Sequence, residues 1–153
     1  MGNWLKYKYN CSKYQRIFEE KNHTTWLLLA YIASRRDRPK AAFSRSSAKD
    51  AAMEIARMTH KGGIKEMDIK NILYSHGISY QVVTKLEKTP IDAVAIQMTD
   101  YPAIVVTHRY NDMSKLIFNV LHELGHIVIS RRKTYEKTTP SIFHEEFEAW
   151  HIA

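Results

Sequence analysis

The sequence contains a single cysteine, Cys11, among its 153 residues. One thiol cannot form an internal disulfide, so a scaffold held together by disulfides is excluded, and the chain suits a reducing compartment. Cys11 lies within an apolar pattern at helical spacing. We therefore expect it to pack in a core, as free cysteines commonly do.

Long apolar runs are also missing. The longest, TTWLLLAYIA at residues 24–33, is far too short to cross a bilayer, and the first ten residues, MGNWLKYKYN, lack the apolar centre of a signal peptide. A hydrophobic fraction of 44% with 25% charged residues is ordinary for a globular chain. We therefore expect a soluble, cytoplasmic protein with a hydrophobic core and no membrane association.

Acidic residues are scarce in the first part of the chain. Residues 1–63 hold 13 Lys and Arg but only 5 Asp and Glu, a net charge of +8, whereas residues 64–153 hold 10 and 11, a net charge of −1. The densest basic piece is SRRDRPKAAFSR at residues 34–45. Such an asymmetry is typical of a surface that binds DNA or an acidic partner, although a solvated basic loop gives the same pattern.

The first 63 residues predict helices. An apolar stripe runs from Trp4 to Glu20, and Thr25 can cap a second helix that reaches Ala33. In SAKD, Ser47 and Asp50 form a pair like a capping box ahead of a third helix. The paired glycines at 62 and 63 would stop this helix. We place a subdomain boundary there, so that residues 1–63 form a basic helical extension.

The remaining residues, 64–153, predict a second domain. A short helix from about Lys65 to His76 ends at Gly77. The hydrophobic period then changes to two in three segments of strand length, which are ISYQVV at 78–83, DAVAIQM at 92–98 and PAIVVT at 102–107. Short polar connections favour antiparallel pairing. We expect an α+β fold, with a small antiparallel-type sheet packed on the next helix and on a C-terminal helix.

That next helix carries two histidines, four residues apart, with a glutamate directly after the first, in NVLHELGHIVIS at residues 119–130. An α-helix turns about 100° per residue, so His122 and His126 lie one turn apart on one face and can reach one metal ion. Glu123 is offset by about 100° and can act as a general base without being a ligand. This is the HExxH pattern of zinc hydrolases. The alternative is an ordinary amphipathic helix with His122 and Glu123 on its surface.

The surroundings of the motif favour the metal site. Apolar residues recur at helical spacing from Met113 to Val128, and Asp112 or Ser114 can cap the helix. A catalytic zinc site normally has three protein ligands and a water molecule. SIFHEEFEAWHIA at residues 141–153 is rich in His and Glu, so we expect the third ligand there.

Four segments resemble, in order, the ImmA/IrrE family of metallopeptidase domains: IKNILYSHGISYQVV, AIVVT, FNVLHELGHIVIS and EEFEAWHIA. In that family HELGH is followed by a helix of the form ExEANxFA. The resemblance covers residues 64–153. It implies a zinc-dependent endopeptidase, encoded in bacteria or mobile elements, that acts on helix-turn-helix repressors of the XRE class.

The resemblance also implies roles for individual residues. His122 and His126 match the zinc ligands, and Glu123 matches the catalytic glutamate. The family's ExEA falls on residues 146–149, so the third ligand is Glu146 or Glu148. Zinc peptidases of related design often have Asp or Asn four residues after the ligand glutamate, and this spacing favours Glu146.

The chain departs from the family at two places. The position four residues after Glu146 is Trp150, and the chain stops at Ala153, inside what the family builds as a longer helix, so this copy is either naturally short or incomplete. These departures motivate an alternative function. The chain would then be a non-catalytic, antitoxin-like binding module with a structural or lost metal, whose basic helices bind DNA or an acidic partner.

Two further expectations concern catalysis. The oxyanion formed during peptide hydrolysis needs an additional hydrogen-bond donor, for which His108, Tyr110, Tyr135 and His144 qualify by type and by nearness in sequence. A peptide substrate can bind by adding to an exposed edge strand. PAIVVT at 102–107 is the candidate strand.

Overall fold

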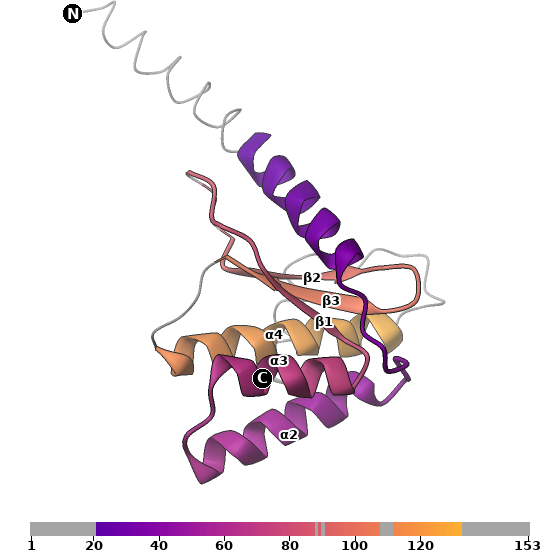
Figure 1. Ribbon diagram of the computed structural model, residues 1–153, viewed down its shortest axis with the longest axis vertical. Coiled ribbons are helices and arrows are strands. Elements are labelled where there is room, and N and C mark those ends of the chain that lie inside the picture. Colours follow the sequence, from indigo (N-terminus) through magenta and orange to yellow (C-terminus); the bar gives the residue numbers. More distant parts are fainter. Residues whose placement is uncertain (1–20, 88, 90, 108–111, 133–153) are drawn as a thin grey trace, which may run out of the picture.

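The computed structural model describes residues 21–87, 89, 91–107 and 112–132. They form four helices and a three-stranded sheet, which confirms the α+β class (Figure 1). A helix over residues 21–36, named here the N-terminal helix, comes first. It is followed by α2 (Ser47–Lys61), α3 (Glu66–Ser75), β1 (Ser79–Val82), β2 (Ala93–Gln97), β3 (Pro102–Val106) and α4 (Met113–Arg132). No helix among these residues has the length and apolar character that crossing a membrane requires.

The sheet is mixed, with the strand order β1-β3-β2. β2 and β3 form an antiparallel pair in which Ala95 lies opposite Ile104, whereas β1 runs parallel to β3 with Tyr80 opposite Ile104. The three strands are those that the sequence predicts, but the prediction of antiparallel pairing is wrong for β1 and β3. Consecutive strands do alternate in direction, so β1 and β3 run the same way. Because β3 lies between β1 and β2, it pairs directly with β1, and this pairing is parallel.

β3 is the central strand, and all five of its residues are buried. The prediction that PAIVVT forms an exposed edge strand is therefore wrong. Its backbone groups pair with β1 on one side and β2 on the other. In the described sheet, β1 and β2 are the edge strands.

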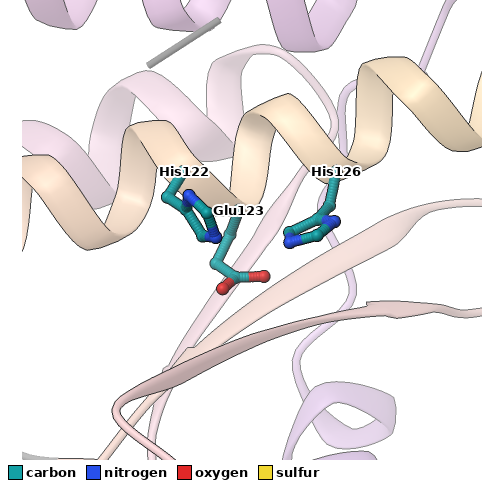
Figure 2. A group of neighbouring side chains, drawn as sticks. All are labelled: His122, Glu123 and His126. Carbon is teal, nitrogen blue, oxygen red and sulfur yellow. The ribbon is translucent and has the colours of Figure 1, made fainter. Parts of the chain in front are cut away.

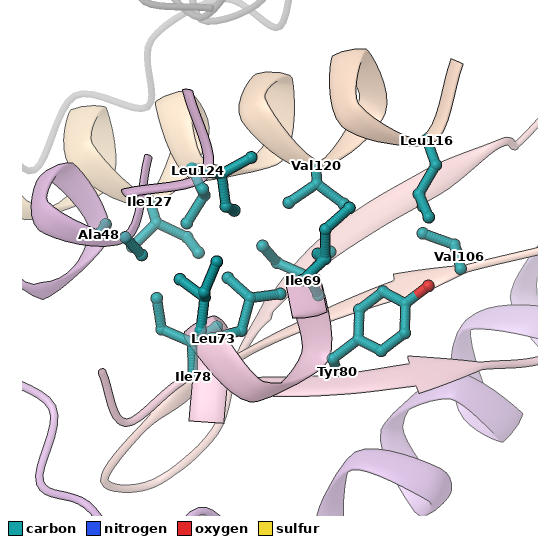
Figure 3. Packing of buried hydrophobic residues seen from close by; sticks show 14 of the residues in the cluster. Ala48, Ile69, Leu73, Ile78, Tyr80, Val106, Leu116, Val120, Leu124 and Ile127 are labelled. Carbon is teal, nitrogen blue, oxygen red and sulfur yellow. The ribbon is translucent and has the colours of Figure 1, made fainter. Parts of the chain in front are cut away.

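The main hydrophobic core lies between the sheet and the helices α2, α3 and α4 (Figure 3). Alternation along the strands turns Tyr80 of β1 and Ile104 and Val106 of β3 to this side. The helices contribute Ala48, Ala51 and Ile55 from α2, Ile69, Ile72 and Leu73 from α3, and Leu116, Val120, Leu124 and Ile127 from α4. Gly62 and Gly63 thus separate two helices that share one core. The division of the chain into two domains at this point stays a prediction.

The N-terminal helix covers the opposite face of the sheet (Figure 1). Trp26 and Ala30 are fully buried against Val105 of β3, and the Trp26 indole N–H donates a hydrogen bond of 3.4 Å to the Val83 carbonyl. The helix passes through Thr25 without a break, so the prediction that Thr25 caps it is wrong. Burial of Trp26 outweighs the weak helix propensity of the two threonines. The predicted helix from Trp4 to Glu20, with Cys11, lies outside the described residues.

The starts of α2 and α3 differ in how well the sequence predicts them. Ser47 is the first residue of α2 rather than its cap, and its Oγ accepts a hydrogen bond of 2.8 Å from the Ser44 N–H. The predicted pairing of Ser47 with Asp50 as a capping box is therefore wrong. α3 lies within the predicted range, and the Lys65 N–H donates to the Asp68 carboxylate at its start. Gly77 follows with a φ of +76°, as expected for a helix terminator.

Candidate metal centre

The HExxH residues lie near the middle of α4, which the core holds in place. Its buried apolar residues recur at intervals of four and three, which orients one face of the helix toward the sheet. At its start, the Ser114 N–H donates a hydrogen bond of 2.9 Å to the Asp112 carboxylate. Asp112 is thus the cap, one of the two residues predicted for it. The helix places the motif in a rigid element.

His122, Glu123 and His126 project from the same side of α4, with the Glu123 carboxylate between the two imidazoles (Figure 2). Their possible ligand atoms all lie within 4.8 Å of one another. The two imidazole rings have centroids 4.9 Å apart and are nearly perpendicular, at 87°. The sequence therefore predicts correctly that these three side chains meet.

The site lies at the border of the buried face of α4. His122 and Glu123 are each only 8% exposed, and His126 is half-buried. The alternative in which His122 and Glu123 are ordinary surface residues is therefore wrong. Electrostatic interactions are stronger in such a partly dehydrated place than on an open surface. A divalent cation held there would compensate the charge of the Glu123 carboxylate.

The donor set and its spacing fit a zinc ion. Imidazole nitrogens are common zinc ligands, and two of them bound at about 2.0–2.1 Å in a tetrahedral site lie roughly 3.4 Å apart. Separations within 4.8 Å can be brought to that value by small side-chain rotations. The described residues supply two imidazole ligands and a carboxylate beside them, and a zinc site needs one more protein ligand.

The strand beneath part of α4 carries small side chains. Ala93 and Ala95 of β2 pack against the core that α4 shares, while Val94 and Ile96 turn to the other face of the sheet. Two alanines, rather than two large residues, thus lie on the face of β2 that is turned to the helices.

Phe118 is a residue of the site that the sequence analysis missed. Its ring stacks on the His122 imidazole, with centroids 6.2 Å apart and an angle of 16° between the planes. Phe118 is 39% exposed, although it is a large apolar residue. Phe118 lies four residues before His122, the same interval that separates His122 from His126, so the spacing places it on the same face of the helix. The contact itself depends on side-chain orientation.

Several predicted site residues lie outside the described residues. They are the third-ligand candidates Glu146 and Glu148, with Trp150, and the oxyanion-donor candidates His108, Tyr110, Tyr135 and His144. Their roles stay predictions.

Comparisons of the chain with protein-family models, with curated proteins and with solved structures found no match. The function has to be argued from the site itself.

Proposed function

We propose that the chain is a zinc-dependent endopeptidase that cleaves a helix-turn-helix repressor of the XRE class in a bacterial or mobile-element regulatory system. One observation carries the hydrolytic part of the proposal: His122, Glu123 and His126 converge on one side of α4, with their ligand atoms within 4.8 Å of one another. The repressor as substrate is supported by the resemblance of residues 64–153 to the ImmA/IrrE family.

In the proposed enzyme, His122 and His126 hold the zinc ion together with Glu146. Bound zinc supplies a Lewis acid, which polarises the peptide carbonyl and makes a water molecule more acidic. Glu123 takes a proton from the attacking water and can return it to the amine that leaves. Because Glu123 directly follows His122 on a rigid helix, its carboxylate is held close to the reacting atoms without an ordering step.

The test compares Glu123→Gln with the parent protein. As a general base that is not a ligand, Glu123 contributes to proton transfer and not to zinc affinity, so the variant should keep its zinc and its fold. Cleavage of a co-expressed XRE-class repressor should fall by about 10² to 10⁴, the usual contribution of a positioned base. Zinc content by elemental analysis and repressor cleavage on gels are the measurements.

Two further variants serve as controls. His122→Ala should lose both zinc and cleavage, whereas Glu87→Gln, a change of the same kind at an exposed residue, should lose neither. Less than about a tenth of an equivalent of zinc in both the parent and His122→Ala, even after zinc is added, would exclude the metallopeptidase. If the parent binds zinc, and parent and Glu123→Gln bind the repressor or DNA equally without cleavage, the chain is a binding module.

A further inference from the structure

The N-terminal helix has a second apolar face that is open to solvent. Leu28 is 58% exposed, Leu29 41%, Tyr31 42% and Ile32 38%. Side chains three and four residues apart are neighbours on a helix, so these residues form one patch, named here the exposed stripe. Leu28 and Ile32, four residues apart, form its central row.

The helix cannot bury this stripe by rotating about its axis, because its opposite face is already packed against the sheet. Trp26 and Ala30 are fully buried against the sheet, and Leu28 and Ile32 each lie about 160° around the helix from Ala30. The end of the helix is also held, because the Tyr101 hydroxyl donates a buried hydrogen bond of 2.8 Å to the Ser34 carbonyl. The stripe thus lies on a helix that is packed against the sheet and held at its end. This helix is the indigo one in Figure 1.

Positive charge borders the stripe. Residues 21–45 hold six Lys and Arg, all exposed, and one acidic residue, Asp37. Lys21 lies in line with Leu28 and Ile32 at one end, and Arg35 and Arg36 flank the other end. Neither arginine forms an ion pair with a residue that the structure describes.

The next two charged residues, Asp37 and Arg38, interact with other parts of the protein. Asp37 accepts a hydrogen bond of 2.7 Å from the Tyr74 hydroxyl, and Arg38 forms a salt bridge of 2.6 Å with Asp100. Burial is the main cause that raises the pKa of Tyr74, so this phenol remains neutral and continues to donate to Asp37. The charge next to the stripe is therefore that of Lys21, Arg35 and Arg36.

We propose that the exposed stripe, with Lys21, Arg35 and Arg36, is the docking surface for an amphipathic helix of a partner protein, whose apolar stripe is bordered by Asp and Glu. An apolar row with neighbours three and four residues apart is the ridge into which a second helix packs. Basic residues at both ends select acidic residues on that helix. This inference does not depend on the proposed peptidase activity.

Other occupants fit the surface less well. A second copy of the chain would place Lys21, Arg35 and Arg36 against one another in either direction, and like charges repel. Nucleic acid is bound chiefly through its phosphates, and these make no use of exposed Leu and Ile. Amphipathic helices that lie in membranes often run for 20–30 residues, whereas the exposed stripe, within the part of the chain that the structure describes, occupies residues 28–32.

The experiment measures binding of the full chain to a fluorescent helix-forming peptide. The peptide carries leucines at i, i+3, i+4 and i+7, bordered by glutamates, and a second peptide has lysines in place of the glutamates. We expect the acidic peptide to bind at least about tenfold more tightly than the basic one. A double variant, Leu28→Ser with Ile32→Ser, and a second one, Arg35→Glu with Arg36→Glu, should each weaken binding by about tenfold or more.

Matched controls use other exposed residues. Met53→Ser with Met67→Ser removes apolar side chains that are 55% and 62% exposed on α2 and α3, and Lys49→Glu with Arg57→Glu reverses exposed charges on α2. Both should bind the acidic peptide within about twofold of the parent. Because all substituted residues are exposed, circular dichroism should show unchanged helix content.

Three results would overturn the proposal. The first is binding of the acidic peptide that neither double variant weakens, or no binding at all. The second is sedimentation of the parent as a dimer that Leu28→Ser with Ile32→Ser dissociates, which would identify a second copy as the occupant. The third is tighter binding to duplex DNA or to anionic phosphatidylserine vesicles than to the acidic peptide, with the same variants abolishing it.

Discussion

Phe118, His122 and His126 lie on successive turns of α4, and each ring contacts the next. Phe118 therefore limits the orientations of the His122 imidazole, although it has no atom that binds zinc. An aromatic pair of this kind contributes about 0.5–1.5 kcal/mol. We infer that Phe118 is a positioning residue for the proposed zinc site.

Phe118→Ala should weaken zinc binding by about two- to tenfold, because that range of free energy corresponds to such a change in affinity. Phe118→Tyr keeps the ring and should bind zinc as the parent does. Zinc affinity is measured by competition with a chromogenic chelator. Equal affinities of Phe118→Ala and the parent, with Met67→Ala as the exposed apolar control, would show that the stacking does not position His122.

The third ligand can be assigned by two substitutions of the same kind. Glu146→Gln should lower zinc affinity by about a hundredfold, whereas Glu148→Gln should change it by less than about threefold, because only a ligand carboxylate contributes both a charge and a bond to the metal. The same chelator competition measures both. The opposite ranking would assign the ligand to Glu148 and reverse the orientation expected for the last helix.

At the scale of the elements, the turn between α3 and β1 is closely packed at Gly77. Gly77 has a φ of +76°, and a Cβ atom there would lie 2.6 Å from the Phe43 backbone nitrogen. Gly63 has a nearly equal φ of +78° but nothing within 4 Å of its Cβ position. Alanine substitutions at the two glycines thus distinguish two contributions to the free energy of unfolding. Both positions have the left-handed backbone conformation, and only Gly77 adds a collision.

Gly77→Ala should lower the free energy of unfolding by roughly 2–4 kcal/mol, since it adds a collision with backbone to a left-handed conformation. Gly63→Ala should lower it by only about 1–2 kcal/mol, the cost of that conformation alone. Urea unfolding followed by circular dichroism measures both. Similar losses in the two variants would mean that the loop at Phe43 moves aside.

The helices and strands of the described residues are largely predictable from sequence, because hydrophobic spacing is a local property. HELGH lies on a helix because apolar residues surround it at intervals of three and four, and the three β-branched segments form strands. The pairing of the strands is not local. The sequence does carry one indication that β3 is the central strand. The continuous apolar run from Ala103 to Val106 is typical of a strand buried on both faces.

The candidate site is likewise predictable only where its geometry is local. That His122, Glu123 and His126 lie close together follows from the geometry of one helix, so the sequence is sufficient to predict it. How deeply the three residues are buried depends on how α4 lies against the sheet, and the contact with Phe118 depends on side-chain orientation. Neither can be obtained from spacing alone.

At the scale of the whole molecule, the core crosses the boundary that the glycines at 62 and 63 suggest. Ala48, Ala51 and Ile55 of α2 are buried in the same cluster as Leu124 and other residues of α4. Removing α2 would expose this part of the core. Burial of one isoleucine contributes about 1.5–3 kcal/mol, and two alanine methyl groups add roughly 1–2 kcal/mol. The total is a large part of the roughly 5–15 kcal/mol that stabilises a typical domain.

A fragment of residues 64–153 should therefore lose its cooperative unfolding transition or unfold at a much lower urea concentration than the full chain. A fragment of residues 21–153 keeps every buried residue that the structure describes and should retain the transition. Urea titration monitored by circular dichroism, with and without zinc, compares the two, since zinc stabilises a folded state that binds it. If the fragment 64–153 unfolds cooperatively and at the urea midpoint of the full chain, the contacts of α2 with α4 contribute little. Residues 1–63 and 64–153 would then be separate folding units.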